Sequence, residues 1–426
     1  MNRILTLAFT ANLFEWYEFS LTAFMALEIG RRFFPATSEK AALMLSFMVF
    51  ASSYLARPVG SIFFGYLGDR RGTGPALKLS ILGMAIPATL IAALPTYETA
   101  GYVATGLLLG LKIIQGFCAG GELPLTGYFV SLNTSQGNRG VHCAIAVASG
   151  FFGMLLASGV IVILPGAVAA LSRYNSVIPD RYIPAPWRWP FLSCIPLAMF
   201  IYAIRASISN APIRGERIGS GRRTAWPLIQ ACALVAFMEI TIYSLFVWMP
   251  SYLHVYLGVS SADASATNSI ALFIFAVSMI GAGFGSRYVD ASILVVIGMS
   301  LVSVSALPLF ILLQKTTFVA LMAVQVTFAM LASCIVGVIF VVLPDLFKDN
   351  WGSLGMVTTY SISTAIFGGT APLVCAYLIK ATRLLTAPAL YILFAGMLAT
   401  PVAYQLMRQR LRVLDPSDGS MLSVYR

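Results

Sequence analysis

Residues 9–24 read FTANLFEWYEFSLTAF, and two carboxylates, Glu15 and Glu18, stand in this otherwise apolar stretch. An ionisable side chain near the centre of a bilayer costs roughly 2.5 kcal/mol or more, so it normally faces a bundle interior or a wet cavity. At helical spacing the polar side chains share one face of the stretch: Asn12, Glu15, Glu18 and Thr22. An interfacial helix with its polar face in water is the alternative. Because the flanking residues are continuously apolar, we favour a helix inside a membrane bundle.

The composition indicates a membrane protein. The 426-residue chain is 59% hydrophobic and only 10% charged, and its mean hydropathy is +0.86. Soluble domains carry about 25% charged residues. We therefore predict an all-α membrane protein with twelve transmembrane helices. Apolar runs of the roughly 20 residues that cross a bilayer lie at 4–29, 41–66, 75–94, 99–131, 141–170, 187–208, 226–257, 266–288, 291–313, 318–345, 354–380 and 388–407.

A polar segment divides the chain into two halves. Residues 209–224 read SNAPIRGERIGSGRRT and separate six predicted spans from six. Two six-helix halves around a site at mid-membrane are the layout of many alternating-access transporters. We predict a bundle of six helices over 1–208, a cytoplasmic linker over 209–225, and a second six-helix bundle with a short cytoplasmic tail over 226–426.

The charge distribution predicts the orientation in the membrane. If both termini are cytoplasmic, more than half of the 27 Lys and Arg residues lie on the inner side, which is the bias that cytoplasmic loops show. The net charge of +11 therefore does not point to nucleic acid. We expect no cleavable signal peptide, because acids interrupt the first apolar segment. The six cysteines have no paired spacing, so we expect neither a disulfide framework nor a metal site.

A second polar group lies in the predicted span 99–131. On a continuous helix one face would carry Lys112, Gln115, Ala119 and Glu122. Two roles stay open for Lys112: it contacts the solute, or it neutralises an acid of residues 9–24 as a buried pair. Arg57, next to Pro58 in the second span, either lines a cavity or bonds backbone carbonyls freed at the kink.

Glu239 is an acid within the predicted span 226–257. This span is the second-half counterpart of the first, and we expect Glu239 and Glu15 to reach the midplane alike. Glu239 either pairs with a basic group of the solute, carries a proton, or belongs to a local ion pair. Tyr243 and Phe246 share its face. Aromatic rings beside a carboxylate suit an alkylammonium, although helix packing also explains such a stripe.

The acids predicted inside the membrane outnumber the bases. Four acids stand against two bases, which favours a zwitterion or a cation over a dicarboxylate: Glu15, Glu18, Glu122 and Glu239 against Arg57 and Lys112. A carboxyl group that alternates between dry and wet surroundings can also load and release a proton. We assign proton coupling to Glu15, Glu122 and Glu239. This interpretation requires Glu15 and Glu239 to face one cleft shared by both halves.

A segment with spaced glycines follows the second predicted span. Residues 65–72 read GYLGDRRG, in which glycines allow a tight turn and close helix approach. The segment resembles the signature loop between helices two and three of the major facilitator superfamily. This resemblance implies that Asp69 faces residues 351–354 in a latch that locks the outward-open state. It implies a gating role for Gly65, Asp69, Arg70, Gly72 and Arg139.

Further stretches resemble the metabolite:proton symporter family of that superfamily, which includes proline/betaine, alpha-ketoglutarate and citrate transporters. They are EWYEF (15–19), RPVG (57–60), QGFCAGGE (115–122), NRG (138–140), WPFL (189–192), MPSYL (249–253) and GGTAPL (368–373). Lys112 resembles the proline/betaine branch, since dicarboxylate transporters tend to have Arg there. The second-half copy of the signature loop, residues 285–290, is eroded, so we expect an asymmetric latch.

We predict a proton-coupled secondary transporter that imports a small zwitterionic or cationic solute, such as an amino acid or betaine, across a bacterial inner (plasma) membrane. The expected solute contacts are Glu15, Trp16, Glu18, Arg57, Lys112, Gln115, Glu239 and Tyr243. An organic-acid:proton symporter, an efflux antiporter and a non-transporting receptor are the alternatives. The chain has no Walker-type loop or nucleophile elbow. We therefore expect no enzyme activity and no cofactor beside the proton gradient, and a monomer with solute, protons and lipid as its partners.

Overall fold

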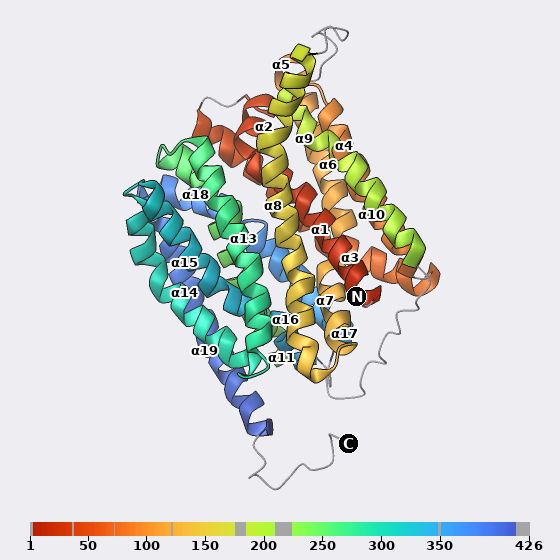
Figure 1. The fold of residues 1–426 in the computed structure, drawn as a ribbon, viewed down its shortest axis with the longest axis vertical. Coiled ribbons are helices and arrows are strands. Elements are labelled where there is room, and N and C mark those ends of the chain that lie inside the picture. The colour runs from red at the N-terminus through yellow and green to blue at the C-terminus, as the bar shows by residue number, and fades with distance from the viewer. Residues whose placement is uncertain are drawn as a thin grey trace.

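The computed structural model describes residues 3–35, 38–71, 73–120, 122–174, 185–208, 224–347 and 351–414. Every regular element among these residues is helical (Figure 1). Ten of the described helices are long and apolar enough to cross a membrane by length and composition. The 22-residue helix α1 and the shorter apolar segment Leu79–Ala93 stand where the first and third spans are expected. The predicted all-helical membrane fold is confirmed, and the count of twelve spans stays a prediction.

The first half of the chain forms the helices drawn in red to yellow-green in Figure 1. They are α1 (Arg3–Phe24), α2 (Ala26–Phe33), α3 (Glu39–Arg71), α4 (Thr73–Ala93), α5 (Tyr97–Ala100), α6 (Tyr102–Ala119), α7 (Glu122–Leu132), α8 (Gln136–Tyr174), η2 (Pro186–Arg188), α9 (Trp189–Leu192) and α10 (Cys194–Ile208).

The second half forms the helices drawn in green to blue. They are α11 (Trp226–Ile242), η3 (Tyr243–Val247), α12 (Met249–Ser251), η4 (Tyr252–Tyr256), α13 (Ser261–Gly285), α14 (Ala291–Leu313), α15 (Phe318–Val336), α16 (Ile339–Phe347), α17 (Gly352–Ser363), η5 (Thr364–Gly368), α18 (Ala371–Thr382) and α19 (Ala387–Leu414). The predicted linker falls largely outside the described residues, so the domain boundaries stay predictions.

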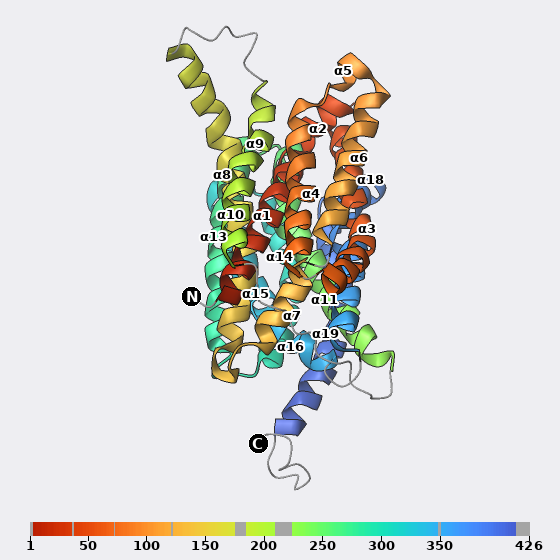
Figure 2. The ribbon, with the colours of Figure 1, turned by 90° about the vertical axis from the view of Figure 1, so that its right-hand side faces the viewer.

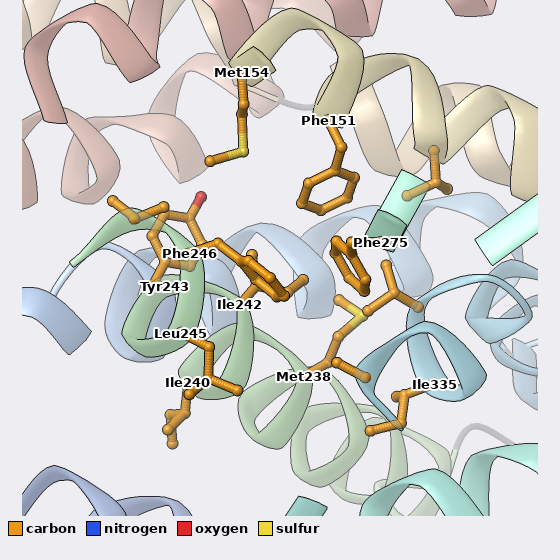
Figure 3. Packing of buried hydrophobic residues seen from close by; sticks show 14 of the residues in the cluster. Phe151, Met154, Met238, Ile240, Ile242, Tyr243, Leu245, Phe246, Phe275 and Ile335 are labelled. Atoms are coloured by element: carbon orange, nitrogen blue, oxygen red, sulfur yellow. The ribbon is translucent and has the colours of Figure 1, made fainter. Parts of the chain in front are cut away.

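The two halves pack side by side along their length. Helices α8 and α13 run next to each other through the middle of the bundle, and the view turned by 90° shows the helices of both halves nearly parallel (Figure 2). Aromatic rings fill the contact. Phe151 of α8 meets Phe275 of α13 edge to face at 4.6 Å between ring centroids, and Phe246 of η3 stacks on Phe275 at 4.5 Å (Figure 3). The predicted aromatic face that includes Phe246 is therefore engaged in helix packing.

The predicted span 99–131 is not one continuous helix. Helix α6 ends at Ala119 and α7 begins at Glu122, because Gly120 leaves the helical conformation with φ −59° and ψ 125°. The expectation that Lys112 and Glu122 share one helical face is therefore wrong. Glycine carries the largest entropic cost in a helix interior, which makes this the natural place for the chain to break.

Two spans of the second half contain π-helical turns near their middle. The segment η3 follows α11 directly, and η5 follows α17 directly. A π turn inserts an extra residue into the helix and occurs mostly at functional sites. Together with the break at Gly120, these turns divide three predicted spans at points far from their ends.

Glycines let α3 and α6 approach closely. A Cβ atom added at Gly116 would lie 1.7 Å from the carbonyl oxygen of Ser53, and one at Gly60 would lie 1.7 Å from the carbonyl oxygen of Phe117. Small residues allow this backbone contact between helices in membranes, where lipid gives no hydrophobic driving force for association. The contact holds α3, and with it Arg57, at a fixed height against α6.

We expect Gly116→Val to separate α3 from α6, because the added methyl groups would overlap the backbone near Ser53. Overpacking of this kind costs about 1–3 kcal/mol of folding free energy, which a lower midpoint of thermal unfolding in detergent would measure. Gly106 lies on the same helix and a Cβ there meets nothing within 4 Å. Gly106→Val is the matched control, and an equal loss in both variants would contradict the packing argument.

Candidate functional site

A cavity lies between the two halves, and the chain breaks described above border it. The first half contributes α1, α3, α6 and α7, and the second half contributes α11, α17 and η5. The lining residues are Glu15, Trp16, Arg57, Ala119, Leu123, Pro124, Glu239, Tyr360, Ser361 and Thr364. Discontinuous helices at a repeat interface are where transporters bind solutes. The cavity has room for about one water molecule, so the halves have to separate before a solute can enter.

Glu15 and Arg57 form a buried ion pair on the first-half wall. Arg57 Nη1 donates to Glu15 Oε1 at 2.7 Å, and the two side chains are only 8% and 1% exposed. Breaking such a pair by removing one partner is costly, because a buried charge is then left without compensation. Of the two roles open for Arg57, the structure therefore places it in the cavity lining, paired with an acid from α1.

Aromatic rings surround the guanidinium of Arg57. Its Cζ atom lies 4.0 Å from the ring centroid of Tyr54 and 4.3 Å from that of Phe19. Cation–π attraction is strongest where water is excluded. The hydroxyl of Tyr243 donates to the hydroxyl of Tyr54 at 2.6 Å, so the surroundings of Arg57 reach into the second half through one hydrogen bond between tyrosines.

Glu239 forms the opposite wall of the cavity. It is 2% exposed, and Thr364 of η5 donates to its Oε1 at 2.9 Å. Within the described residues Oε2 has no hydrogen-bond partner, and Glu239 has no cation within 4 Å. The ion-pair role that the sequence left open for Glu239 is therefore not observed in the described part of the chain.

The π turn η5 holds the Glu239 carboxylate in place. A Cβ atom added at Gly368 would lie 2.9 Å from Glu239 Oε2 and 2.9 Å from Tyr243 Cε2. Any larger residue would push the carboxylate or the tyrosine ring aside. The extra residue of the turn and the absence of a side chain at Gly368 together give Glu239 its position.

A second polar network lies inside the first half, away from the cavity lining. Gln115 Nε2 donates to Glu18 Oε2, and Lys112 Nζ donates to Thr22 Oγ1 at 2.9 Å. Lys112 also lies 4.9 Å from the ring centroid of Phe19. Because its hydrogen bond goes to a hydroxyl, Lys112 acts here as a brace between α1 and α6.

The structure thus divides the predicted solute contacts into groups. Four line the cavity together: Glu15, Trp16, Arg57 and Glu239. Tyr243 packs behind them, with its ring centroid 5.9 Å from that of Trp16. Glu18, Lys112 and Gln115 belong to the first-half network. The side-chain surroundings of the predicted proton site Glu122 and of the predicted gating residues Gly65, Asp69, Arg70 and Gly72 lie outside what the structure describes.

Arg139, the remaining predicted gating residue, takes part in an ion-pair network between the halves. Its Nη2 lies 3.0 Å from Oδ1 of Asp345 on α16. Arg410 of α19 approaches the same carboxylate at 2.9 Å and lies 3.5 Å from Asp290. The network sits at the lower end of the bundle in Figure 1, where α8 begins and α16 ends.

Further contacts join the halves. At the lower end Arg287 donates to the carbonyl of Gly137 at 2.9 Å and to Asn138 Oδ1 at 2.6 Å. Within the length of α8 and α13 the hydroxyls of Ser158 and Ser269 lie 2.7 Å apart. The eroded loop of residues 285–290 therefore still makes contacts at the lower end. Arg287 contacts the first half, and Asp290 contacts Arg410 of α19.

Sequence reasoning missed several of these residues. Asp345 follows Pro344 at the end of an apolar run, and the same criterion that singled out Glu239 would have found it. Tyr360 and Thr364 carry no such signal, because hydroxyl side chains are common in membrane helices. Only the π turn and the packing of α17 against α3 bring them to the cavity.

The cavity lining combines charged and hydrogen-bonding side chains. The described residues contain no group of three or more His, Cys, Asp or Glu that could hold a metal ion. Two acids and one guanidinium offer charge and hydrogen bonds to a polar solute. The cavity lies at the interface of two bodies that could move against each other.

Comparison with known proteins identifies relatives over nearly the whole chain. The profile of the Major Facilitator Superfamily matches residues 5–372. The Proline/betaine transporter of Escherichia coli is 27% identical over 92% of this chain and 81% of its own length. The Citrate-proton symporter of Salmonella typhi is 29% identical over 93% of this chain and 92% of its own length.

A solved structure shows the same fold. The proton:xylose symporter XylE superposes with a TM-score of 0.69 over 95% of each chain, at 16% sequence identity. At this identity the likeness concerns the fold alone.

We expect Arg57→Met to destabilise the protein by about 3–5 kcal/mol, because it removes the cation that compensates buried Glu15. The double variant Arg57→Met/Glu15→Gln should recover part of this loss, which unfolding of the purified proteins would measure. The exposed pair of Arg32 and Glu28 supplies the control, since Arg32→Met should cost at most about 1 kcal/mol. A double variant no more stable than Arg57→Met would refute a specific pair.

We expect Asp345→Asn to loosen the lower end, because it removes the shared carboxylate of Arg139 and Arg410. Cys143 of α8 is 1% exposed and contacts the carbonyl of Phe340 across the interface. In a chain that keeps Cys143 as its only cysteine, alkylation by a maleimide should become several-fold faster. Glu98→Gln at an exposed site is the control. An unchanged rate in Asp345→Asn would show that the ion pairs do not hold this end closed.

Proposed function

The chain belongs to the major facilitator superfamily, and on this premise we propose that it is a proton-coupled symporter that imports a small zwitterionic or cationic solute by alternating access. As a multi-pass membrane transporter it is not an enzyme. An amino acid or a betaine is the kind of solute we propose.

The observation that carries this proposal is the cavity shared by Glu15 and Glu239. The two acids come from opposite halves and line one space with Arg57. Arg57 compensates Glu15 at 2.7 Å, so the lining keeps one excess negative charge when both acids are ionised. A cationic group of the solute would supply the missing positive charge, whereas a dianion would be repelled. The ammonium of the solute would lie towards Glu239, and its carboxylate towards Arg57.

The contacts between the halves support alternating access. Polar contacts at the lower end involve Arg139, Asp345 and Arg287, and one contact within the length of α8 and α13 joins Ser158 and Ser269. Opening at the lower end requires the contacts there to break. Rocking of two halves around a fixed site is the common mechanism of transporters built from repeats.

Proton coupling requires a carboxyl group whose surroundings change during the cycle. A carboxyl group that faces a dry cavity in one state and water in another can load and release a proton in each cycle. We propose the two cavity acids, Glu15 and Glu239, and in addition Glu122 for this role. Glu18, Lys112 and Gln115 brace α1 against α6 in the closed cavity, and we propose that they join the solute site when the cavity widens.

The relatives support the proposed solute class and the proposed coupling to protons. They include transporters named for proline and betaine and a symporter named for citrate and protons. We place the chain in a bacterial inner membrane as a monomer, with both termini in the cytoplasm. Transport of an organic acid with protons is the second candidate, because Arg57 also offers a carboxylate partner.

We expect radiolabelled proline to accumulate in proteoliposomes that contain the protein when the outside is made acidic, because inward proton flow would drive symport. A thermal-shift screen of amino acids, betaines and carboxylates would first select the solute to label. Competition by citrate, which lacks an amine, would favour the organic-acid alternative. Accumulation only under the opposite gradient would indicate efflux, and binding without any accumulation would indicate a receptor.

A further inference from the structure

The two acids of the cavity differ in the partners that the protein already gives them. Glu15 already has the guanidinium of Arg57 at 2.7 Å. Glu239 accepts a hydrogen bond from Thr364 and also lies near the hydroxyl of Tyr360, while its Oε2 is buried without a hydrogen-bond partner among the described residues. The cationic end of a solute is therefore drawn to Glu239, and specifically to an oxygen that lacks a donor.

The aromatic rings near the cavity are already engaged. Arg57 lies over the rings of Tyr54 and Phe19, so a cation of the protein itself occupies the ring faces that an alkylammonium would use. Trp16 packs against Phe151 with ring centroids 5.4 Å apart. A cage of free aromatic faces, which is the usual way to bind a quaternary ammonium, is not formed by these residues.

The position of Glu239 Oε2 is fixed by its neighbours. Thr364 holds the other oxygen, and the backbone at Gly368 leaves no room for even one added carbon atom beside Oε2. Turning the carboxylate would break the hydrogen bond from Thr364. A buried acceptor without a donor is unfavourable, so a ligand that brings an N–H group gains more here than one that brings only charge.

We propose that Glu239 makes this site selective for solutes whose cationic nitrogen carries at least one N–H. Primary, secondary and tertiary ammonium groups can each donate a charge-assisted hydrogen bond to Oε2. A quaternary ammonium has the same charge but no donor, and its methyl groups would hold the charge away from the carboxylate. The inference rests on the proposed function and narrows its solute class to amino acids and related amines, excluding betaines.

Methylation series test this directly, because they keep the carboxylate and the positive charge and remove N–H donors in turn. Calorimetric titration of the purified full-length protein would use glycine, sarcosine, N,N-dimethylglycine and glycine betaine, and separately proline, N-methylproline and proline betaine. We expect the quaternary member of each series to bind at least about tenfold more weakly than the secondary amine. A quaternary member that binds as tightly or more tightly overturns the inference.

Glu239→Gln should shrink this difference to about threefold or less, because the amide keeps the shape and loses the charge that strengthens the hydrogen bond. Glu98→Gln removes an exposed acid far from the cavity and should keep the wild-type difference. An undiminished difference in Glu239→Gln would assign the selectivity to other residues. The wild-type series decides the matter even if the Glu239 variant does not fold.

The outcomes separate this inference from the proposed function. The expected order of affinities without proton uptake during transport would overturn proton coupling and leave the selectivity standing. Equal transport of the quaternary and the secondary amines would agree with the proposed symporter and would overturn the proposed selectivity. If no amine of either series binds, the inference is wrong. If citrate binds in their place, the solute class of the proposed function is wrong as well.

Discussion

The compensation of charge in a dry helical bundle is the constraint on which this structure depends. A buried guanidinium is costly unless an acid compensates its charge, because it loses its hydration. Arg57 meets this condition with Glu15 on one side and the rings of Tyr54 and Phe19 on the others. The backbone contact of α3 with α6 at Gly116 fixes the height at which this happens.

The residues around Arg57 also connect the two halves of the protein. Tyr54 accepts a hydrogen bond from Tyr243, and one turn earlier Glu239 faces the cavity from α11. The π turn that starts at Thr364 supplies the hydroxyl for Glu239. Helix irregularities therefore border the cavity, where η5 supplies Thr364 and α6 ends at Ala119. The ion pairs of Asp345 stand at the end of the interface, where halves that rock must part.

For some residues the sequence correctly indicated a buried position but did not identify the side chain that they contact. The sequence indicated that Lys112 either neutralises an acid of α1 or contacts the solute. Its hydrogen bond goes to Thr22, Arg57 pairs with Glu15, and Glu18 is the acid whose charge acts on Lys112. A helical face drawn through Glu122 was wrong because the chain breaks at Gly120. Asp345 escaped notice although it ends an apolar run. For Lys112 the spacing along the helix was read correctly, and the sequence could not show which side chain of the neighbouring helix it meets.

The sequence by itself determined the class of fold, the approximate course of the spans and the presence of acids inside them, because hydrophobicity and charge are properties of single segments. It also carried the signature that places the chain in its superfamily. Only the tertiary structure decided that Glu15 pairs with Arg57, that Glu239 has no cation within 4 Å among the described residues, and that both acids line one cavity. Pairing between residues on different helices depends on how the helices pack, and the free energy that selects one pair over another arises only when water has been excluded around both.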